Sequence, residues 1–156
     1  MAGTLYVVST PIGNLADLTF RAVTTLKTVD LIAAEDTRTS RKLLGYYDIN
    51  TPLIAYHDNN EITQAKKLVD KLKNGDSIAV ISDAGTPCIS DPGYRIVNLA
   101  SKEEIEVVSI PGPSAVTAAL SVSGLPTDHF YFEGFLPPKK GRKTLFELLE
   151  SLPATI

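Results

Sequence analysis

The sequence has a single cysteine, no tryptophan and no long apolar segment. Its one cysteine, Cys88, cannot form an internal disulfide, which excludes a disulfide-stabilised scaffold and favours a reducing compartment. The apolar runs are short and interrupted, so we expect no membrane span. The first residues, MAGTLYVVSTPIGN, lack the basic start and the apolar length of a signal peptide. These absences predict a cytoplasmic protein with no membrane contact.

An excess of positive charge is also missing. The 156 residues include 15 Lys and Arg against 18 Asp and Glu, a formal net charge of -3. With 44% hydrophobic and 21% charged residues, the composition is that of a globular chain about one domain long. We expect no broad basic face, so any contact with a nucleic acid has to be local.

Several common site motifs do not occur. The chain contains no G-x-x-x-x-G-K-[ST] phosphate loop and no G-x-G-x-x-G after its first apolar run. Its two histidines, His57 and His129, are far apart, and no cluster has the spacing of metal ligands. No Ser/His/Asp set stands out. We therefore predict no metal site and no triad hydrolase.

Short apolar runs rich in β-branched residues alternate with helical patterns. Strands alternating with helices imply a parallel sheet with right-handed crossovers. We predict an α/β fold: a five-stranded, mostly parallel sheet with helices on both faces. The expected strands are 4–9, 30–35, 52–56, 77–82 and 105–110, and the expected helices are 18–29, 39–47, 61–75, 91–102 and one from about 113.

The pattern breaks at Gly124-Leu125-Pro126, where Gly and Pro predict a boundary. Beyond it, HFYFEGF (129–135) reads as a strand and RKTLFELLESL (142–152) as a helix. One strand and one helix cannot close a core. We expect residues 1–124 to form an N-terminal α/β domain and residues 125–156 to be the start of an incomplete second domain.

Four of the five expected strands end in loops of unusual content. In an open parallel sheet these ends share one edge, and such folds bind ligands there. Proline stiffens a loop, and glycine lets its backbone approach a ligand closely. Exposed main-chain groups of this kind suit the edge of a heterocycle and the hydroxyls of a ribose. The loops are Thr10-Pro11-Ile12-Gly13-Asn14, Glu35-Asp36-Thr37-Arg38-Thr39-Ser40, Ser82-Asp83-Ala84-Gly85-Thr86-Pro87-Cys88-Ile89-Ser90-Asp91-Pro92-Gly93 and Pro111-Gly112-Pro113-Ser114-Ala115.

Within the third loop, Asp83 follows its strand directly, and we expect it to contact a ligand. Asp91 and Pro92 lie later, before a helical pattern. Asp is a common N-cap and Pro a common first helical residue, so we expect these two to start the helix.

The segment EDTRTSRKLL combines both signs of charge. Glu35 or Asp36 could serve as a base, or could hold Arg38 over an anionic substrate. The alternative is an ordinary helix start, with Thr37 or Thr39 as the cap and with Arg41 and Lys42 on a solvated face. The one basic cluster of the sequence, PPKKGRK (137–143), follows several aromatic residues. It is either solvated or in contact with RNA phosphates.

Five separated segments, taken together, resemble the ribosomal RNA small subunit methyltransferase I family, the RNA-modifying branch of the tetrapyrrole methylases. They are LYVVSTPIGNLADLTFRA, AEDTRTSRKLL, SDAGTPCISDPG, IPGPSAVTAALSVSGLP and FEGFLPPKKGRK, in order over essentially the whole chain. The resemblance implies S-adenosyl-L-methionine as cofactor, folded in a cleft between two α/β domains and held mainly by main-chain groups. It also implies 2′-O-methylation of a cytidine ribose in the 16S rRNA of the 30S subunit, and a homodimer.

The loops themselves and the resemblance together predict which residues form the site. The expected catalytic residues are Glu35, Asp36 and Arg38. Family members carry a full second domain, so we expect this shorter chain to bind S-adenosylmethionine weakly and not to turn over. Two rival functions are a small-molecule, tetrapyrrole-type methyltransferase and a non-catalytic dimerising module. The expected cofactor-binding residues are Pro11, Ile12, Gly13, Asn14, Asp83, Ala84, Gly85, Thr86, Ser114 and Ala115.

Overall fold

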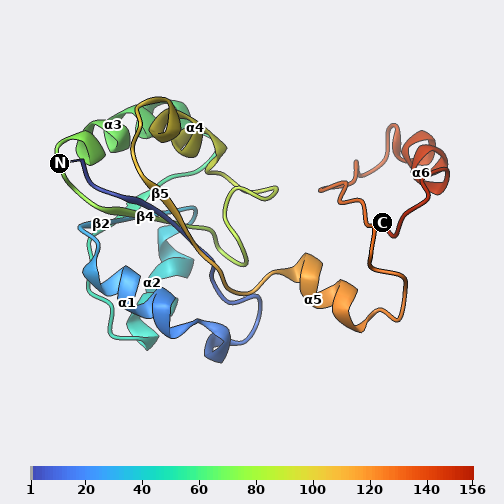
Figure 1. Cartoon of the computed structure of the whole chain (residues 1–156), viewed down its shortest axis with the longest axis horizontal. Helices are drawn as coiled ribbons and strands as arrows, with labels where there is room; N and C mark the ends of the chain where they lie inside the picture. The colour runs from blue at the N-terminus through green and yellow to red at the C-terminus, as the bar shows by residue number, and fades with distance from the viewer. Residues whose placement is uncertain (1) are drawn as a thin grey trace. The chain divides into compact units, whose positions relative to one another are not determined.

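The computed structural model of the protein describes residues 2–156 (Figure 1). It divides into two compact units, the first ending at Ser114 and the second spanning Ala115–Ile156. The division precedes helix α5 (Ala115–Val122), whereas the sequence pattern places a boundary after residue 124. The units reflect packing alone, so the domains 1–124 and 125–156 stay a prediction.

The first unit contains the predicted five-stranded sheet, and every pair of neighbouring strands in it is parallel. The strand order is β3-β2-β4-β1-β5. Strands β2 and β4 lie inside the sheet and are buried throughout, which explains their unbroken apolar sequences LIAA and IAVI. The strands are β1 (Leu5–Val8), β2 (Leu31–Ala34), β3 (Leu53–Ala55), β4 (Ile78–Ile81) and β5 (Val107–Ile110).

Helices cover both faces of this sheet, as predicted. Figure 1 shows α1 (Phe20–Thr28) and α2 (Thr37–Tyr46) on one side, and α3 (Glu61–Lys73) and α4 (Tyr94–Lys102) on the other. Because strand side chains alternate between faces, β4 contributes to both cores. Ile78 and Val80 join the core under α3 and α4, whereas Ala79 and Ile81 join the core under α1 and α2.

The apolar residues that recur at helical spacing in the predicted helices 18–29 and 61–75 are buried, with one exception. Ile62, in the first turn of α3, is 59% exposed and lies in the groove between α3 and α4 beside Tyr94. The first turn of α3 contacts α4 rather than the sheet, so its apolar residue stays partly open. The buried stripe residues are Leu18, Ala22, Leu26 and Val29 around α1, and Ala65, Leu68, Val69 and Leu72 in α3.

The second unit contains α5 and α6 (Arg142–Glu150), but the strand predicted at 129–135 does not form. Phe130 makes a single isolated bridge, to Thr155. A strand needs a neighbour along its length, and the described residues of this unit offer only this one partner. Leu149 is the one buried apolar side chain among residues 115–156.

No helix among the described residues has both the length and the apolar character needed to cross a bilayer.

Close packing at Gly3 yields a stability prediction. A Cβ at Gly3 would lie 1.9 Å from the main-chain oxygen of Asp76, so Gly3→Ala has to displace backbone. We expect it to lower the free energy of unfolding by about 2 kcal/mol or more in urea titrations. Gly45→Ala is the control, because nothing lies within 4 Å of its Cβ position. It should raise stability by about 0.5 kcal/mol. Equal effects of the two changes would contradict the packing at Gly3.

Candidate functional site

The loops after β1 and β4 are joined where these neighbouring strands end. The N–H of Thr10 donates to the carbonyl of Gly85 (2.9 Å), and the N–H of Gly85 donates back to the carbonyl of Thr10 (3.1 Å). The Thr10 hydroxyl also donates to the carbonyl of Ser82 (3.1 Å). Gly85 has a φ of +88°, a conformation that favours glycine. These bonds place the two loops side by side.

The loop after β5 joins the same edge. The hydroxyls of Ser9 and Thr86 lie 3.0 Å apart, and the Thr86 hydroxyl donates to the carbonyl of Pro113 (3.4 Å). A Cβ at Gly112 would lie 3.0 Å from the Cβ of Ser9, so glycine allows this close approach. The loops after β1, β4 and β5 therefore form one continuous edge.

The loop after β2 completes this edge through a reciprocal contact. The N–H of Asp36 donates to Oδ1 of Asp83 (3.1 Å), and the N–H of Asp83 donates to Oε2 of Glu35 (3.4 Å). The predicted meeting of four loops at the carboxyl ends of the strands is thus confirmed. We call the joined loops the rim. It comprises residues 9–14, 35–38, 82–86 and 111–114.

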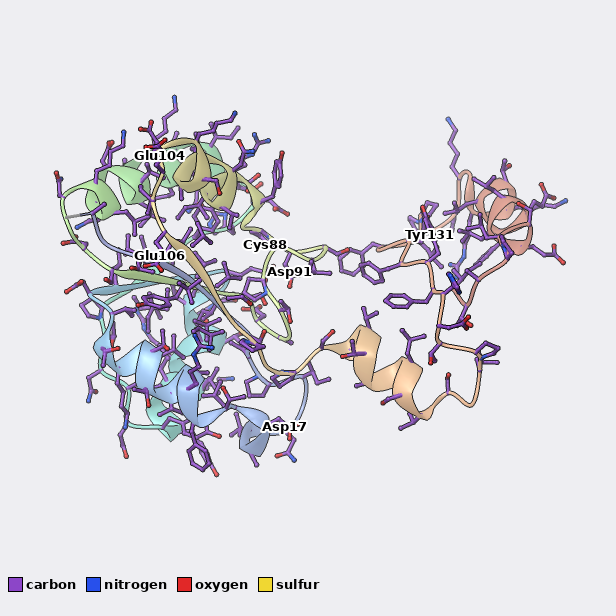
Figure 2. All side chains as sticks on the ribbon, in the orientation of Figure 1. Asp17, Cys88, Asp91, Glu104, Glu106 and Tyr131 are labelled. Carbon is purple, nitrogen blue, oxygen red and sulfur yellow. The ribbon has the colours of Figure 1, made fainter. Side chains whose placement is uncertain are left out.

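The loop from β4 to α4 is held in unusual backbone conformations. Gly85, Cys88, Ser90 and Gly93 all have positive φ. The Cys88 sulfur lies 2.5 Å from the position that a Gly93 Cβ would occupy, so the loop folds back tightly on itself. Figure 2 labels Cys88 and Asp91 on this loop.

The helix start predicted at Asp91 and Pro92 is wrong. Helix α4 begins at Tyr94, and its N-cap is Gly93, which makes no side-chain cap bond. With a φ of 138°, Gly93 breaks the chain direction between Asp91 and the first helical turn. Burial raises the pKa of Asp91, and the nearby hydroxyl of Ser82 opposes the rise.

The start of α2 shows features of both interpretations of EDTRTSRKLL. The N-cap is Asp36, whose Oδ1 accepts the Arg38 N–H at 2.8 Å, so caps at Thr37 or Thr39 are ruled out. The same carboxylate binds the Arg38 guanidinium through Nε (3.1 Å) and Nη2 (2.8 Å). Asp36 therefore holds Arg38, as one interpretation predicted, and Arg41 and Lys42 are exposed, as the other predicted. A role of Arg38 over an anionic substrate stays a prediction.

Glu35 and Asp36 are adjacent but differ in their electrostatics. Partial burial raises the pKa of Glu35; the Asp83 N–H opposes the rise, and the negative charges of Asp83, Asp91 and Asp58 add to it. Hydrogen bonds from Arg38 lower the pKa of Asp36 to about 2. Glu35 is thus the better proton acceptor, and Asp36 remains an anion at any ordinary pH.

The rim has polar groups that can hold a nucleoside. Within residues 2–156 the main-chain N–H groups of Ile12, Gly13 and Ala84 have no hydrogen-bond partner, and these residues are exposed. No atom lies within 4 Å of the position that a Gly13 Cβ would fill. Asp83 uses Oδ1 for the Asp36 N–H, which leaves Oδ2 for a ligand hydroxyl. These donors and this acceptor fit the edge of a base and the hydroxyls of a ribose.

The remaining predicted cofactor-binding residues are placed by the loops and helices in which they lie. Pro11 and Asn14 lie in the rim loop after β1, where Asn14 caps a short 3-10 helix, η1 (Leu15–Asp17). Ser114 ends the first unit and Ala115 begins α5. The cofactor-binding and catalytic roles of the named residues stay predictions. No group of His, Cys, Asp and Glu side chains in residues 2–156 is arranged to hold a metal ion.

The sequence interpretation included Thr10 and Gly112 in the candidate loops but gave neither of them, nor Ser9, a role at the site. Ser9 and Thr10 are almost fully buried, and their hydroxyls contact Thr86 and the Ser82 carbonyl. Two hydroxyl residues directly after the apolar run LYVV are a usable sequence signal, because polar groups at the end of a buried strand need partners.

A family model described as "Tetrapyrrole (Corrin/Porphyrin) Methylases" matches residues 4–155. The chain belongs to this family. Two solved structures share its fold. The uroporphyrin-III-C-methyltransferase of Thermus thermophilus has a TM-score of 0.59 at 21% identity, covering 81% of this chain and 54% of that one. A diphthine synthase has a TM-score of 0.65 at 14% identity, covering 83% and 52%.

The resemblance to the ribosomal RNA small subunit methyltransferase I proteins is also confirmed. The chain is 55% identical to the protein of that name from Halalkalibacterium halodurans and 53% identical to that from Escherichia coli O157:H7. Each alignment covers 99% of this chain and 54% of the relative. The chain therefore spans about half the length of these curated relatives.

The two neighbouring carboxylates yield a pH prediction. In an NMR titration Glu35 should titrate above its ordinary pKa and Asp36 near a pKa of 2. Asp83→Asn should lower the pKa of Glu35, because it removes a like charge. The folded chain keeps the Glu35 proton longer than the unfolded chain, so this group makes stability fall as pH rises between the two pKa values. A Glu35 pKa at or below its ordinary value would contradict the burial described.

Proposed function

We propose that the protein is an S-adenosyl-L-methionine-dependent methyltransferase that methylates the ribose 2′-hydroxyl of a cytidine in 16S rRNA of the 30S subunit. The observation that carries the proposal is the rim, four hydrogen-bonded loops in a chain of the tetrapyrrole methylase family. The names of relatives more than 50% identical to it support RNA as the substrate. The rim matches the place where open parallel sheets bind ligands.

In this proposal the rim binds the cofactor through its backbone and one carboxylate. The free N–H groups of Ile12, Gly13 and Ala84 face acceptors on the base. Asp83 accepts from the ribose hydroxyls with Oδ2, while Oδ1 stays on the Asp36 N–H. Thr86 is held by Ser9 and by the Pro113 carbonyl, so its loop is fixed before the ligand arrives.

The cofactor supplies an activated methyl group, so the chain mainly has to align the substrate hydroxyl and remove its proton. Glu35 has the raised pKa that suits a general base. Asp36 is a poor base, because both of its oxygens bind Arg38. We assign Asp36 the task of orienting Arg38, whose exposed guanidinium faces the anionic RNA.

The proposal extends to partners and compartment. The second unit carries the basic cluster 137–143, in which Lys139 and Lys140 are exposed, and we propose that it also contacts RNA phosphate. Arg142 lies over the Phe146 ring at 5.4 Å, so part of its charge is already engaged. A homodimer is proposed from the family resemblance, and a cytoplasmic location suits the free thiol of Cys88.

Asp83→Asn tests the cofactor site. The amide can still accept the Asp36 N–H but accepts more weakly from a ribose hydroxyl. We expect the affinity for S-adenosylmethionine to fall about tenfold in calorimetry, the value of one hydrogen bond. Asp58→Asn is the matched control, because it removes an equal charge from an exposed residue outside the rim. An equal loss in both variants would show a general charge effect and contradict the assignment.

Glu35→Gln tests the base. In a version extended to the length of the relatives, it should lower the methylation rate on 30S subunits about 100-fold or more and leave cofactor affinity unchanged. Asp36→Asn should lower the rate less and leave cofactor affinity unchanged as well.

A porphyrinoid should accept no methyl group. Methylation of the porphyrinoid instead of RNA would favour the small-molecule rival, and an unchanged rate would remove Glu35 from the mechanism.

A further inference from the structure

The outward face of α2 carries a group of cations. Arg38, Arg41 and Lys42 are all exposed, and their i, i+3, i+4 spacing places them together on one side of the helix. Tyr46, one turn after Lys42, is 63% exposed on the same side. Its ring packs edge-on against Tyr47, with centroids 5.0 Å apart, so its position is fixed. We call Arg38, Arg41, Lys42 and Tyr46 the α2 face.

The opposite side of α2 is fully used by the fold. Ser40, Leu43 and Leu44 are buried against the sheet. The residues of the α2 face are exposed and contribute no side chain to the core of the first unit.

The charge of the α2 face is not neutralised. The helix itself contains no acidic residue, and no carboxylate in residues 2–156 forms an ion pair with Arg41 or Lys42. Asp36 binds Arg38 along one edge and leaves Nη1 unused, with the side chain 85% exposed. The nearest acids along the chain, Asp36 and Asp48, lie just outside the two ends of the helix, and Asp36 is engaged with Arg38.

Helix α3, on the other face of the sheet, shows the contrast. It contains acidic residues of its own, and Lys71 and Lys73 form ion pairs with Asp76 and Glu103, whereas Lys66 and Lys67 stay unpaired within the described residues. Because acidic residues outnumber basic residues in this chain, cations paired with carboxylates are expected. The α2 face combines adjacent unpaired cations and an exposed aromatic ring with a helix that has no acidic residue, and this combination is typical of a site for a polyanion.

The α2 face also begins at the rim. Its first residue, Arg38, is two positions from Asp36, whose N–H is bound to Asp83. Figure 1 shows α2 on the side of the sheet opposite α3 and α4. A strand that places a ribose at the rim can therefore continue directly along α2.

We propose that the α2 face binds the phosphates of a single-stranded RNA segment next to the reacting nucleotide. This inference rests on the proposed RNA methyltransferase function and adds the path of the substrate. The Arg38 fork binds one phosphate, held in orientation by Asp36, and Arg41 and Lys42 bind the following phosphates. Tyr46 offers its ring to a base or a ribose.

The double variant Arg41→Gln/Lys42→Gln tests this path in the full chain. The probe is a cytidine-containing single-stranded RNA oligonucleotide, with affinity measured by fluorescence anisotropy over a series of salt concentrations. We expect the affinity at low salt to fall about tenfold or more. We expect the slope of log K against log salt to shrink by about 1.4, since each phosphate contact contributes about 0.7. Neither residue contacts the rim, so cofactor affinity should not change.

The matched control is Lys66→Gln/Lys67→Gln. It also removes two adjacent, exposed and unpaired cations from a helix, but from α3 on the other face of the sheet. Circular dichroism should show both double variants folded, since all four side chains are exposed. An equal loss of RNA affinity in the control, or an unchanged salt slope in the α2 variant, would overturn the proposal. The proposal would also be overturned if the α2 variant lost affinity only for a polyglutamate peptide and kept its affinity for RNA.

The outcomes separate this inference from the proposed function. If the extended protein methylates RNA and its α2 variant is equally active, the proposed RNA path is refuted and the proposed function is supported. Salt-dependent RNA binding through α2 in a chain with no affinity for S-adenosylmethionine would support the path and refute the function.

Discussion

The pair of main-chain hydrogen bonds between Thr10 and Gly85 is the contact on which the site depends. It joins the loops of β1 and β4, neighbouring strands inside the sheet, and every other rim contact is built outward from these loops. Thr86 reaches the β5 loop from one side of the pair, and Asp83 reaches the β2 loop from the other. A residue other than glycine at position 85 would have to adopt a strained φ of +88° to keep the pair.

The second constraint is electrostatic. Glu35 and Asp36 are adjacent in the chain but have different surroundings. Glu35 is partly buried near other carboxylates, whereas Asp36 binds the Arg38 guanidinium in solvent. Their pKa values therefore move in opposite directions. Two neighbouring carboxylates with such different pKa values are suited to different chemical tasks.

The two units differ in how they use apolar residues. The first has a core on each face of its sheet, formed by alternating strand residues and the inner sides of four helices. The second buries only Leu149 among its described apolar side chains, and Phe135 is 85% exposed. The segment 129–135 has the composition of a strand but lacks the neighbours that would pair with it. The strand predicted from the composition of segment 129–135 is therefore wrong, because a β-strand depends on partners that are distant in the chain.

Much of the first unit followed from the sequence alone. The alternation of apolar runs and helical stripes determined the α/β class, the five strands and the buried sides of α1 and α3, because these patterns depend only on local periodicity. The rim residues Asp83 to Thr86 were found because they follow a strand. Only the tertiary structure decided the strand order, the Thr10–Gly85 pair and the partner of each carboxylate. It also moved the start of α4 from Asp91 to Gly93, since that start depends on how Cys88 folds over Gly93. Such contacts join residues far apart in the chain or depend on backbone torsions, and neither is visible in a local pattern.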